Sequence, residues 1–203
     1  SVFVFSEFNI LPLRGKVLNS EKTKTDELLK NEEIVSLIYS IGAGFGKEFN
    51  ESKSNYNKII IMTDADDDGA HIQVLLLTFF FRYMKDLIDA GKVYLAIPPL
   101  YKINFRNKTE YAWNDDDLKE KTADNKNYTI QRFKGLGEMN ASQLWETTMD
   151  PKTRTLIQVK IDDYTLADDR VSVLMGDDVA PRRNWIDNNV SFDYEDNFTL
   201  EEV

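Results

Sequence analysis

The chain has 203 residues, of which 42% are hydrophobic and 12% aromatic, so it can form one domain and part of a second around an apolar core. It contains one histidine and no cysteine, which excludes disulfides, thiolate metal sites and multi-histidine zinc sites. A formal net charge of −10 argues against a protein that binds nucleic acid over its whole surface, but it leaves room for a local basic patch.

The longest apolar run, residues 72–81, is too short to cross a membrane. It contains Gln73 and Thr78 and is closed by Arg82, whereas a spanning helix needs about 20 apolar residues. The first residues lack the basic stretch and the small-residue cleavage site of a signal peptide. We therefore expect a cytoplasmic protein that does not bind a membrane.

The first half of the chain predicts a strand, a long helix and a second strand. Before them, apolar positions in residues 28–41 follow a broken helical pattern that ends at Gly42, a typical residue after a helix. The β-branched run 59–63 is typical of a strand in a parallel sheet. An apolar helix follows over roughly 70–89, and a strand over 93–97 ends at two prolines. This order predicts a right-handed parallel βαβ unit.

The second half is more polar and predicts shorter elements. The acidic run 115–117 is interpreted as a solvated loop or the start of a helix. Further along, we expect a helix opening at 140–143 with a capping box, a strand over 155–161, a helix over 163–175, and a last helix with Pro181 at its first position.

Three alternating aspartates, Asp64, Asp66 and Asp68, follow the first predicted strand. Ligands of open α/β sheets bind at the carboxyl ends of the strands. A locally extended backbone would direct the three carboxylates to one side, where a hard divalent cation would relieve their repulsion, and Mg²⁺ prefers such oxygen ligands. The alternative without a ligand is a helix N-terminus with acidic residues, which the helix dipole favours.

Two other classes of protein place aspartates at this spacing. An EF-hand loop would need a bidentate Glu at its twelfth position, which is Leu75 here. A phosphatase of the haloacid-dehalogenase type would use Asp64 as its nucleophile, but that pattern agrees only as far as Asp66 and does not expect Asp68.

Several long motifs occur in order along the chain and have to be considered together. They are residues 11–19, 59–72, 98–102, 131–140, 143–151, 174–177 and 181–183. Together they resemble the Toprim and C-terminal region of the B subunit of bacterial type IIA DNA topoisomerases, which comprise gyrase and topoisomerase IV. The resemblance extends from about residue 10 to about residue 192, and residues 41–44 and 183–186 are more similar to the topoisomerase IV branch.

The resemblance implies an α/β fold with a Toprim (Rossmann-like) parallel sheet flanked by helices, and an α+β C-terminal tail region. It implies a Toprim domain over residues 1–104, shortened on its N-terminal side, and the tail region over 105–192. Residues 193–203 form an acidic segment that we expect to be disordered.

The resemblance also implies ATP-dependent, Mg²⁺-dependent passage of one DNA duplex through another, with decatenation and relaxation of DNA. The metal carboxylates would be Asp64, Asp66 and Asp68, and Mn²⁺ or Ca²⁺ could substitute for Mg²⁺. The family's DNA contacts fall on Arg14, Lys16, Asn19 and His71. Arg183 could contact either a phosphate or the acidic residues that follow it.

In this family the nucleophilic tyrosine belongs to the A subunit of an A2B2 heterotetramer, so none of the nine tyrosines here is expected to attack DNA. The family's first Toprim motif, with its general acid–base glutamate, and the ATP-binding domain are expected upstream of Ser1. Glu7 lies too close to Arg14 to be that glutamate, so no catalytic residue is assigned. We expect the isolated chain to be inactive and the whole protein to associate with the nucleoid. The alternative is a fragment that docks the A subunit or DNA without chemistry.

Overall fold

The computed structural model describes residues 8–125 and 127–191, so the predicted acidic segment 193–203 lies outside the described residues. The chain divides into two compact units, Ser1–Asp162 and Asp163–Val203. In the described parts of the chain, no helix is both long and apolar enough to cross a membrane.

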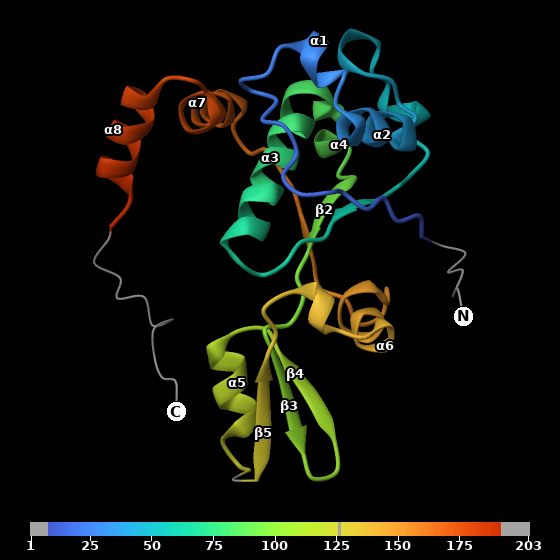
Figure 1. The fold of residues 1–203 in the computed structure, drawn as a ribbon, viewed down its shortest axis with the longest axis vertical. Coiled ribbons are helices and arrows are strands. Elements are labelled where there is room, and N and C mark those ends of the chain that lie inside the picture. The colour runs from blue at the N-terminus through green and yellow to red at the C-terminus, as the bar shows by residue number, and fades with distance from the viewer. Residues whose placement is uncertain (1–7, 126, 192–203) are drawn as a thin grey trace. The chain divides into compact units, whose positions relative to one another are not determined.

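The first unit contains a three-stranded sheet in the order β1-β2-β6 (Figure 1). Strands β1 (Ile59–Ile61) and β2 (Val93–Ala96) are parallel, whereas β6 (Leu156–Gln158) runs antiparallel to β2. Helices α3 (Asp67–Tyr83) and α4 (Lys85–Asp89) connect the parallel pair. The predicted α/β fold and βαβ unit are therefore confirmed, and the single helix predicted over 70–89 is two helices separated at Met84.

Helix α3 begins three residues earlier than predicted because Asp66 caps it. The Asp66 side chain accepts a hydrogen bond from the Gly69 N–H, which satisfies one of the unpaired donors of the first turn. The buried face of α3 includes Phe79, whose ring stacks on Phe45 and Tyr83. The helix that follows the aspartates is thus fixed both at its start and along its apolar face.

Helices α1 (Thr25–Leu28) and α2 (Glu32–Ile41) precede the sheet. Gly42 has a φ of 73° and its N–H donates to the Ile38 carbonyl, which confirms it as the predicted end of the helix. Two short 3-10 turns, η1 (Gly46–Glu48) and η2 (Glu51–Lys53), then lead into β1.

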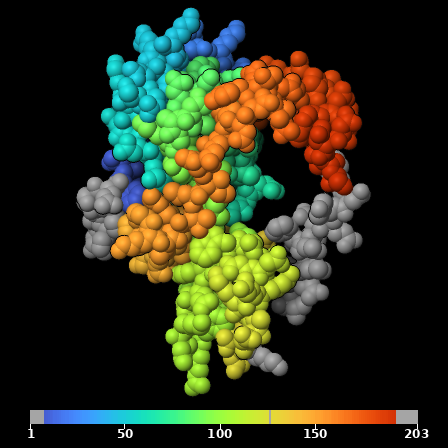
Figure 2. Space-filling view, turned by 180° about the vertical axis from the view of Figure 1, so that it is seen from behind, coloured from blue at the N-terminus to red at the C-terminus, as the bar shows by residue number. Residues whose placement is uncertain are grey.

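Between β2 and β6 the chain forms a second three-stranded sheet, antiparallel and in the order β4-β3-β5. Its strands are β3 (Tyr101–Phe105), β4 (Thr109–Ala112) and β5 (Tyr128–Arg132), and α5 (Asp115–Thr122) connects β4 to β5. The acidic run 115–117 is the first turn of α5, in agreement with the helix-start interpretation. The predicted domain boundary at residue 104 falls inside β3, and none of these three strands was predicted. All five residues of β5 are exposed, and the yellow atoms of this segment lie at the surface in Figure 2.

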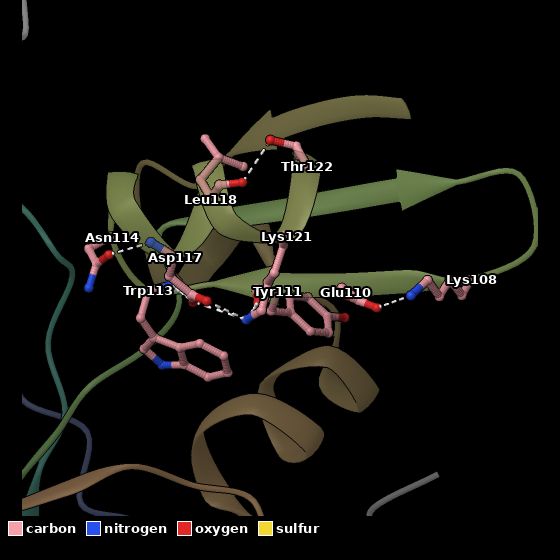
Figure 3. A network of polar contacts seen from close by, with 9 residues as sticks. All are labelled: Lys108, Glu110, Tyr111, Trp113, Asn114, Asp117, Leu118, Lys121 and Thr122. Carbon is pink, nitrogen blue, oxygen red and sulfur yellow. Dashed lines mark hydrogen bonds and ion pairs between the residues drawn. The ribbon is translucent and has the colours of Figure 1, made fainter. Parts of the chain in front are cut away.

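A polar network joins α5 to β4 (Figure 3). The Lys121 ammonium donates to the Tyr111 carbonyl and to Asp117, and the Trp113 N–H also donates to Asp117. Burial raises the pKa of Asp117, but the hydrogen bond from Lys121, the Trp113 N–H and the charge of Lys121 together lower it by more, so the pKa of Asp117 lies below its ordinary value. The indole N–H of Trp113 donates to the Ile97 carbonyl, so this hydrogen bond connects the β4-β3-β5 sheet to the residue that follows β2.

After β5 the chain passes through the 3-10 turn η3 (Leu136–Glu138), α6 (Ala141–Leu144) and the π-helical turn η4 (Trp145–Met149) before it enters β6. The capping box predicted at α6 is present between Asn140 and Gln143. The second unit contains α7 (Tyr164–Met175) and α8 (Val179–Asn189), as predicted, although Pro181 is the third residue of α8 and not the first.

Candidate functional site

A cavity of about 590 Å³ lies at the carboxyl end of β1. Asp64, Asp66 and Asp68 all line it, together with Gly15 of the predicted basic loop and Leu136 of η3. The rest of its lining is mainly apolar and comes largely from residues 8–13, α2, the β1 region, α3 and η4. The three predicted carboxylates therefore line one cavity together with Gly15, the residue between Arg14 and Lys16 of the predicted DNA-binding loop.

Each of the three carboxylates has a different partner. Asp64 accepts a hydrogen bond from the Leu136 N–H at 2.7 Å, and Asp66 accepts one from the Gly69 N–H at 2.7 Å. Asp68 lies in the first turn of α3, and its Oδ1 is 2.8 Å from the Lys16 ammonium. The hydrogen bond and charge of Lys16 lower the pKa of Asp68 below its ordinary value. Burial raises this pKa and His71 lowers it, both by less than Lys16 does.

The expectation of an extended segment with three carboxylates on one side is therefore wrong in its geometry. Only Asp66 and the residues before it are non-helical, because the cap at Asp66 starts α3 at Asp67. Among the residues that the structure describes, no three acidic, histidine or cysteine side chains converge closely enough to hold one metal ion.

The donors nevertheless suit Mg²⁺ in their chemistry. In each carboxylate only one oxygen has a hydrogen bond or ion pair with another residue in the described ranges. Carboxylate oxygens are hard ligands, and all three aspartates line a common cavity. Mg²⁺ commonly takes one or two protein carboxylates and keeps several waters, so it does not need three convergent ligands.

The predicted DNA-binding loop lies along α3 and is held at both of its ends. Gly15 has a φ of 75°, and Lys16 next to it pairs with Asp68 near the start of the helix. The Asn19 side chain accepts a hydrogen bond from the Glu21 N–H, and Glu21 pairs with Arg82 near the end of the helix. This arrangement presents the loop beside the three aspartates.

The other predicted DNA contacts differ in where they lie. Arg14 and His71 are exposed, and Arg14 is close in sequence to Lys16, while His71 follows Asp68 on α3. Arg183 lies on α8, in the second unit. Its neighbour Arg182 donates to the Gly176 carbonyl within that unit.

One part of the site was given no role from the sequence: the resemblance places Lys134 and Glu138 near the cleavage centre but assigns them no chemistry. The loop 134–138, Lys-Gly-Leu-Gly-Glu, reaches Asp64 through the Leu136 N–H, although the two residues are 72 positions apart. In the sequence, Gly135 and Gly137 indicate that the backbone of this loop approaches another group closely, but they do not indicate that the group is Asp64.

Comparisons with known proteins agree with the motifs. A Toprim domain model matches residues 4–97, and a model described as DNA gyrase B subunit, carboxyl terminus, matches residues 125–187. The B subunit of DNA topoisomerase 4 from Enterococcus faecalis is 63% identical over 196 residues, which are 94% of this chain and 29% of that protein.

Two further relatives are B subunits of the same enzyme. The protein of Streptococcus pneumoniae is 59% identical over 92% of this chain and 30% of its own length, and that of Bacillus subtilis is 59% identical over 90% of this chain and 29% of its own length. The chain thus spans about 30% of the length of these curated relatives. The resemblance inferred from the motifs, including its topoisomerase IV branch, is confirmed.

Proposed function

Because the chain belongs to the family of type II DNA topoisomerase B subunits, with a Toprim domain and a gyrase B carboxyl terminus, we propose that it supplies Mg²⁺-binding carboxylates to DNA cleavage by a topoisomerase IV. The observation that carries the proposal is the shared cavity, which brings Asp64, Asp66 and Asp68 beside Gly15 of the basic loop.

The aspartates and the predicted DNA-binding loop have separate tasks in this proposal. Asp64 and Asp66 hold the cation, since backbone N–H groups already fix the orientation of both carboxylates. Arg14, Lys16 and Asn19 bind the phosphate backbone of DNA and position it over the aspartates. Lys16 exchanges its ion pair with Asp68 for a DNA phosphate, because both partners are anions within reach of the same loop.

Bound Mg²⁺ would neutralise negative charge on the phosphate oxygens during cleavage. The nucleophile is a tyrosine hydroxyl of the partner A subunit in an A2B2 assembly. Its oxygen forms a bond to phosphorus, the bond from phosphorus to the sugar oxygen breaks, and a proton passes to that leaving oxygen. ATP is bound by a different part of the whole protein, which acts on chromosomal DNA in the cytoplasm.

The test is Asp66→Asn in the whole B subunit together with its A subunit. Asparagine retains the helix cap, so the fold is expected to stay intact while plasmid cleavage at ordinary Mg²⁺ is lost. Asp67→Asn is the matched control, because Asp67 is the neighbouring acidic residue but does not line the cavity. Undiminished cleavage by Asp66→Asn would contradict the proposal.

A docking role without chemistry is the second candidate, and the lack of three convergent ligands among the described residues favours it. It predicts that the chain binds the A subunit equally well when Asp64, Asp66 and Asp68 are all replaced by Asn. The metal proposal predicts the same binding but also requires that the triple variant no longer binds Mn²⁺, so measuring both quantities separates the two.

A further inference from the structure

The loop 134–138 lies against the Asp64 carboxylate. Besides the hydrogen bond from the Leu136 N–H, a Cβ atom on Gly135 would lie 2.9 Å from both Cγ and Oδ2 of Asp64 and 3.0 Å from Oδ1. Such distances are too short for a Cβ contact, so any side chain at position 135 would displace the carboxylate.

The requirement for glycine at position 135 is steric and does not come from its backbone angles. Gly135 has φ −169° and ψ 168°, an extended conformation that any residue adopts. Position 69 also requires glycine for a steric reason, because a Cβ atom on Gly69 would lie 2.0 Å from the backbone oxygen of Asp64. Two glycines from distant parts of the chain thus enclose Asp64, one at its carboxylate and one at its peptide group.

The loop is itself held in place. The Phe133 N–H donates to the Leu100 carbonyl at 2.8 Å, and the Phe133 side chain is 5% exposed. The Glu138 carboxylate accepts a hydrogen bond from the Lys134 N–H at 3.0 Å, which closes the loop on itself. The Leu136 N–H is therefore a fixed donor, and it belongs to the segment that follows β5.

We propose that the Gly135–Leu136 peptide is a positioning element for the metal site. It holds Oδ1 of Asp64 and thereby leaves Oδ2 for a divalent cation, so the segment after β5 contributes to a site whose carboxylates all lie between the end of β1 and the first turn of α3. This inference rests on the proposed function, because it assumes that Asp64 binds the cation.

The test compares Gly135→Ala with Gly137→Ala in the 203-residue chain, with Mn²⁺ as the probe. Gly137 lies in the same loop, and a Cβ there would meet no atom within 4 Å, so it is a matched control. Gly135→Ala is expected to weaken Mn²⁺ binding about 10- to 100-fold, the range for groups that hold a metal ligand in place. Gly137→Ala is expected to leave the affinity unchanged.

Asp64→Asn separates this inference from the function on which it rests. If Asp64→Asn weakens Mn²⁺ binding and Gly135→Ala does not, the positioning role is wrong and the metal proposal stands. If Asp64→Asn leaves Mn²⁺ binding unchanged, the metal proposal itself is wrong. In the Asp64→Asn background, Gly135→Ala should cause no further loss; an additional loss would show that Gly135 acts through another group.

A second measurement does not depend on the folding of any variant. The ¹⁵N and ¹H shifts of the Leu136 amide in the unsubstituted chain should change on titration with Mg²⁺, because that N–H is bonded to the carboxylate proposed to bind the ion. A Leu136 amide that stays unshifted while other residues of the cavity report Mg²⁺ binding would overturn the inference.

Discussion

Asp66 has two separable roles in the structure, and two substitutions distinguish them. Its carboxylate accepts the Gly69 N–H at 2.7 Å as the cap of the 17-residue helix α3, and it also lines the cavity. Asparagine caps a helix about as well as aspartate but is a poor cation ligand, whereas alanine removes both functions.

The loss of a capping side chain costs about 1 kcal/mol, within a range of about 0.5–2 kcal/mol. Asp66→Ala should therefore reduce the ratio of folded to unfolded chain about fivefold and lower the melting temperature by about 2–4 °C. Asp66→Asn loses only the favourable charge at the helix N-terminus, which costs about 0.3 kcal/mol at an exposed site. Both variants should lose Mn²⁺ affinity to the same extent.

Urea denaturation followed by far-UV circular dichroism measures the stabilities, and Mn²⁺ titration of the folded variants measures the affinities. If alanine and asparagine destabilise the chain equally, Asp66 does not act as a cap. If asparagine retains the Mn²⁺ affinity, the Asp66 carboxylate is not a ligand. Each result refutes one role without affecting the other.

Three further predictions concern the parts of the first unit that support the site. Because the pKa of Asp117 is lowered in the folded state, its pairing with Lys121 stabilises the chain above the ordinary aspartate pKa, and this contribution is lost as the pH falls below that pKa. Asp117→Asn should therefore reduce the dependence of the unfolding free energy on pH in this acidic range, as measured by urea denaturation. Phe79→Ala should cost about 3–5 kcal/mol of unfolding free energy, since Phe79 is fully buried, and a loss below about 1 kcal/mol in urea would contradict the packing described for α3. Glu21→Gln should cost about 1–3 kcal/mol because it breaks a charged hydrogen bond to Arg82, and a double-mutant cycle with Arg82→Met should show that the two effects are coupled.

The βαβ unit could be predicted from the sequence because its signals are local. The run 59–63 is β-branched, the helix that follows is long and apolar, and Gly42 and Gly91 mark the ends of helical segments. The start of α3 was not predicted correctly, because alternating aspartates suggested an extended metal-binding segment. An aspartate followed by acidic residues is also the pattern of a helix cap and first turn, and in the structure this pattern determines the local backbone.

The β4-β3-β5 sheet and the contact of the loop 134–138 with Asp64 could not be predicted in the same way. In strand β5, Tyr128 and Ile130 alternate with Thr129 and Gln131, but the run is only five residues long and buries none of them, so the pattern alone does not identify a strand, and its pairing with β3 determines its conformation. The contact from Leu136 to Asp64 joins positions 72 residues apart. A single sequence carries no signal for such a contact beyond the glycine that makes room for it.

The pairing of Ala96 with Leu156 has a consequence for how this part of the molecule can change. The chain leaves the sheet at the end of β2 and returns to it at the start of β6, beside the same strand. The segment between β2 and β6 is therefore an insertion whose two ends are neighbours in the sheet. Evolution or an engineer could lengthen, shorten or exchange such a cassette without rebuilding the strands on either side. Any segment that replaces it would still need a backbone N–H that donates to Asp64, as Leu136 does, and this requirement limits which segments can be exchanged.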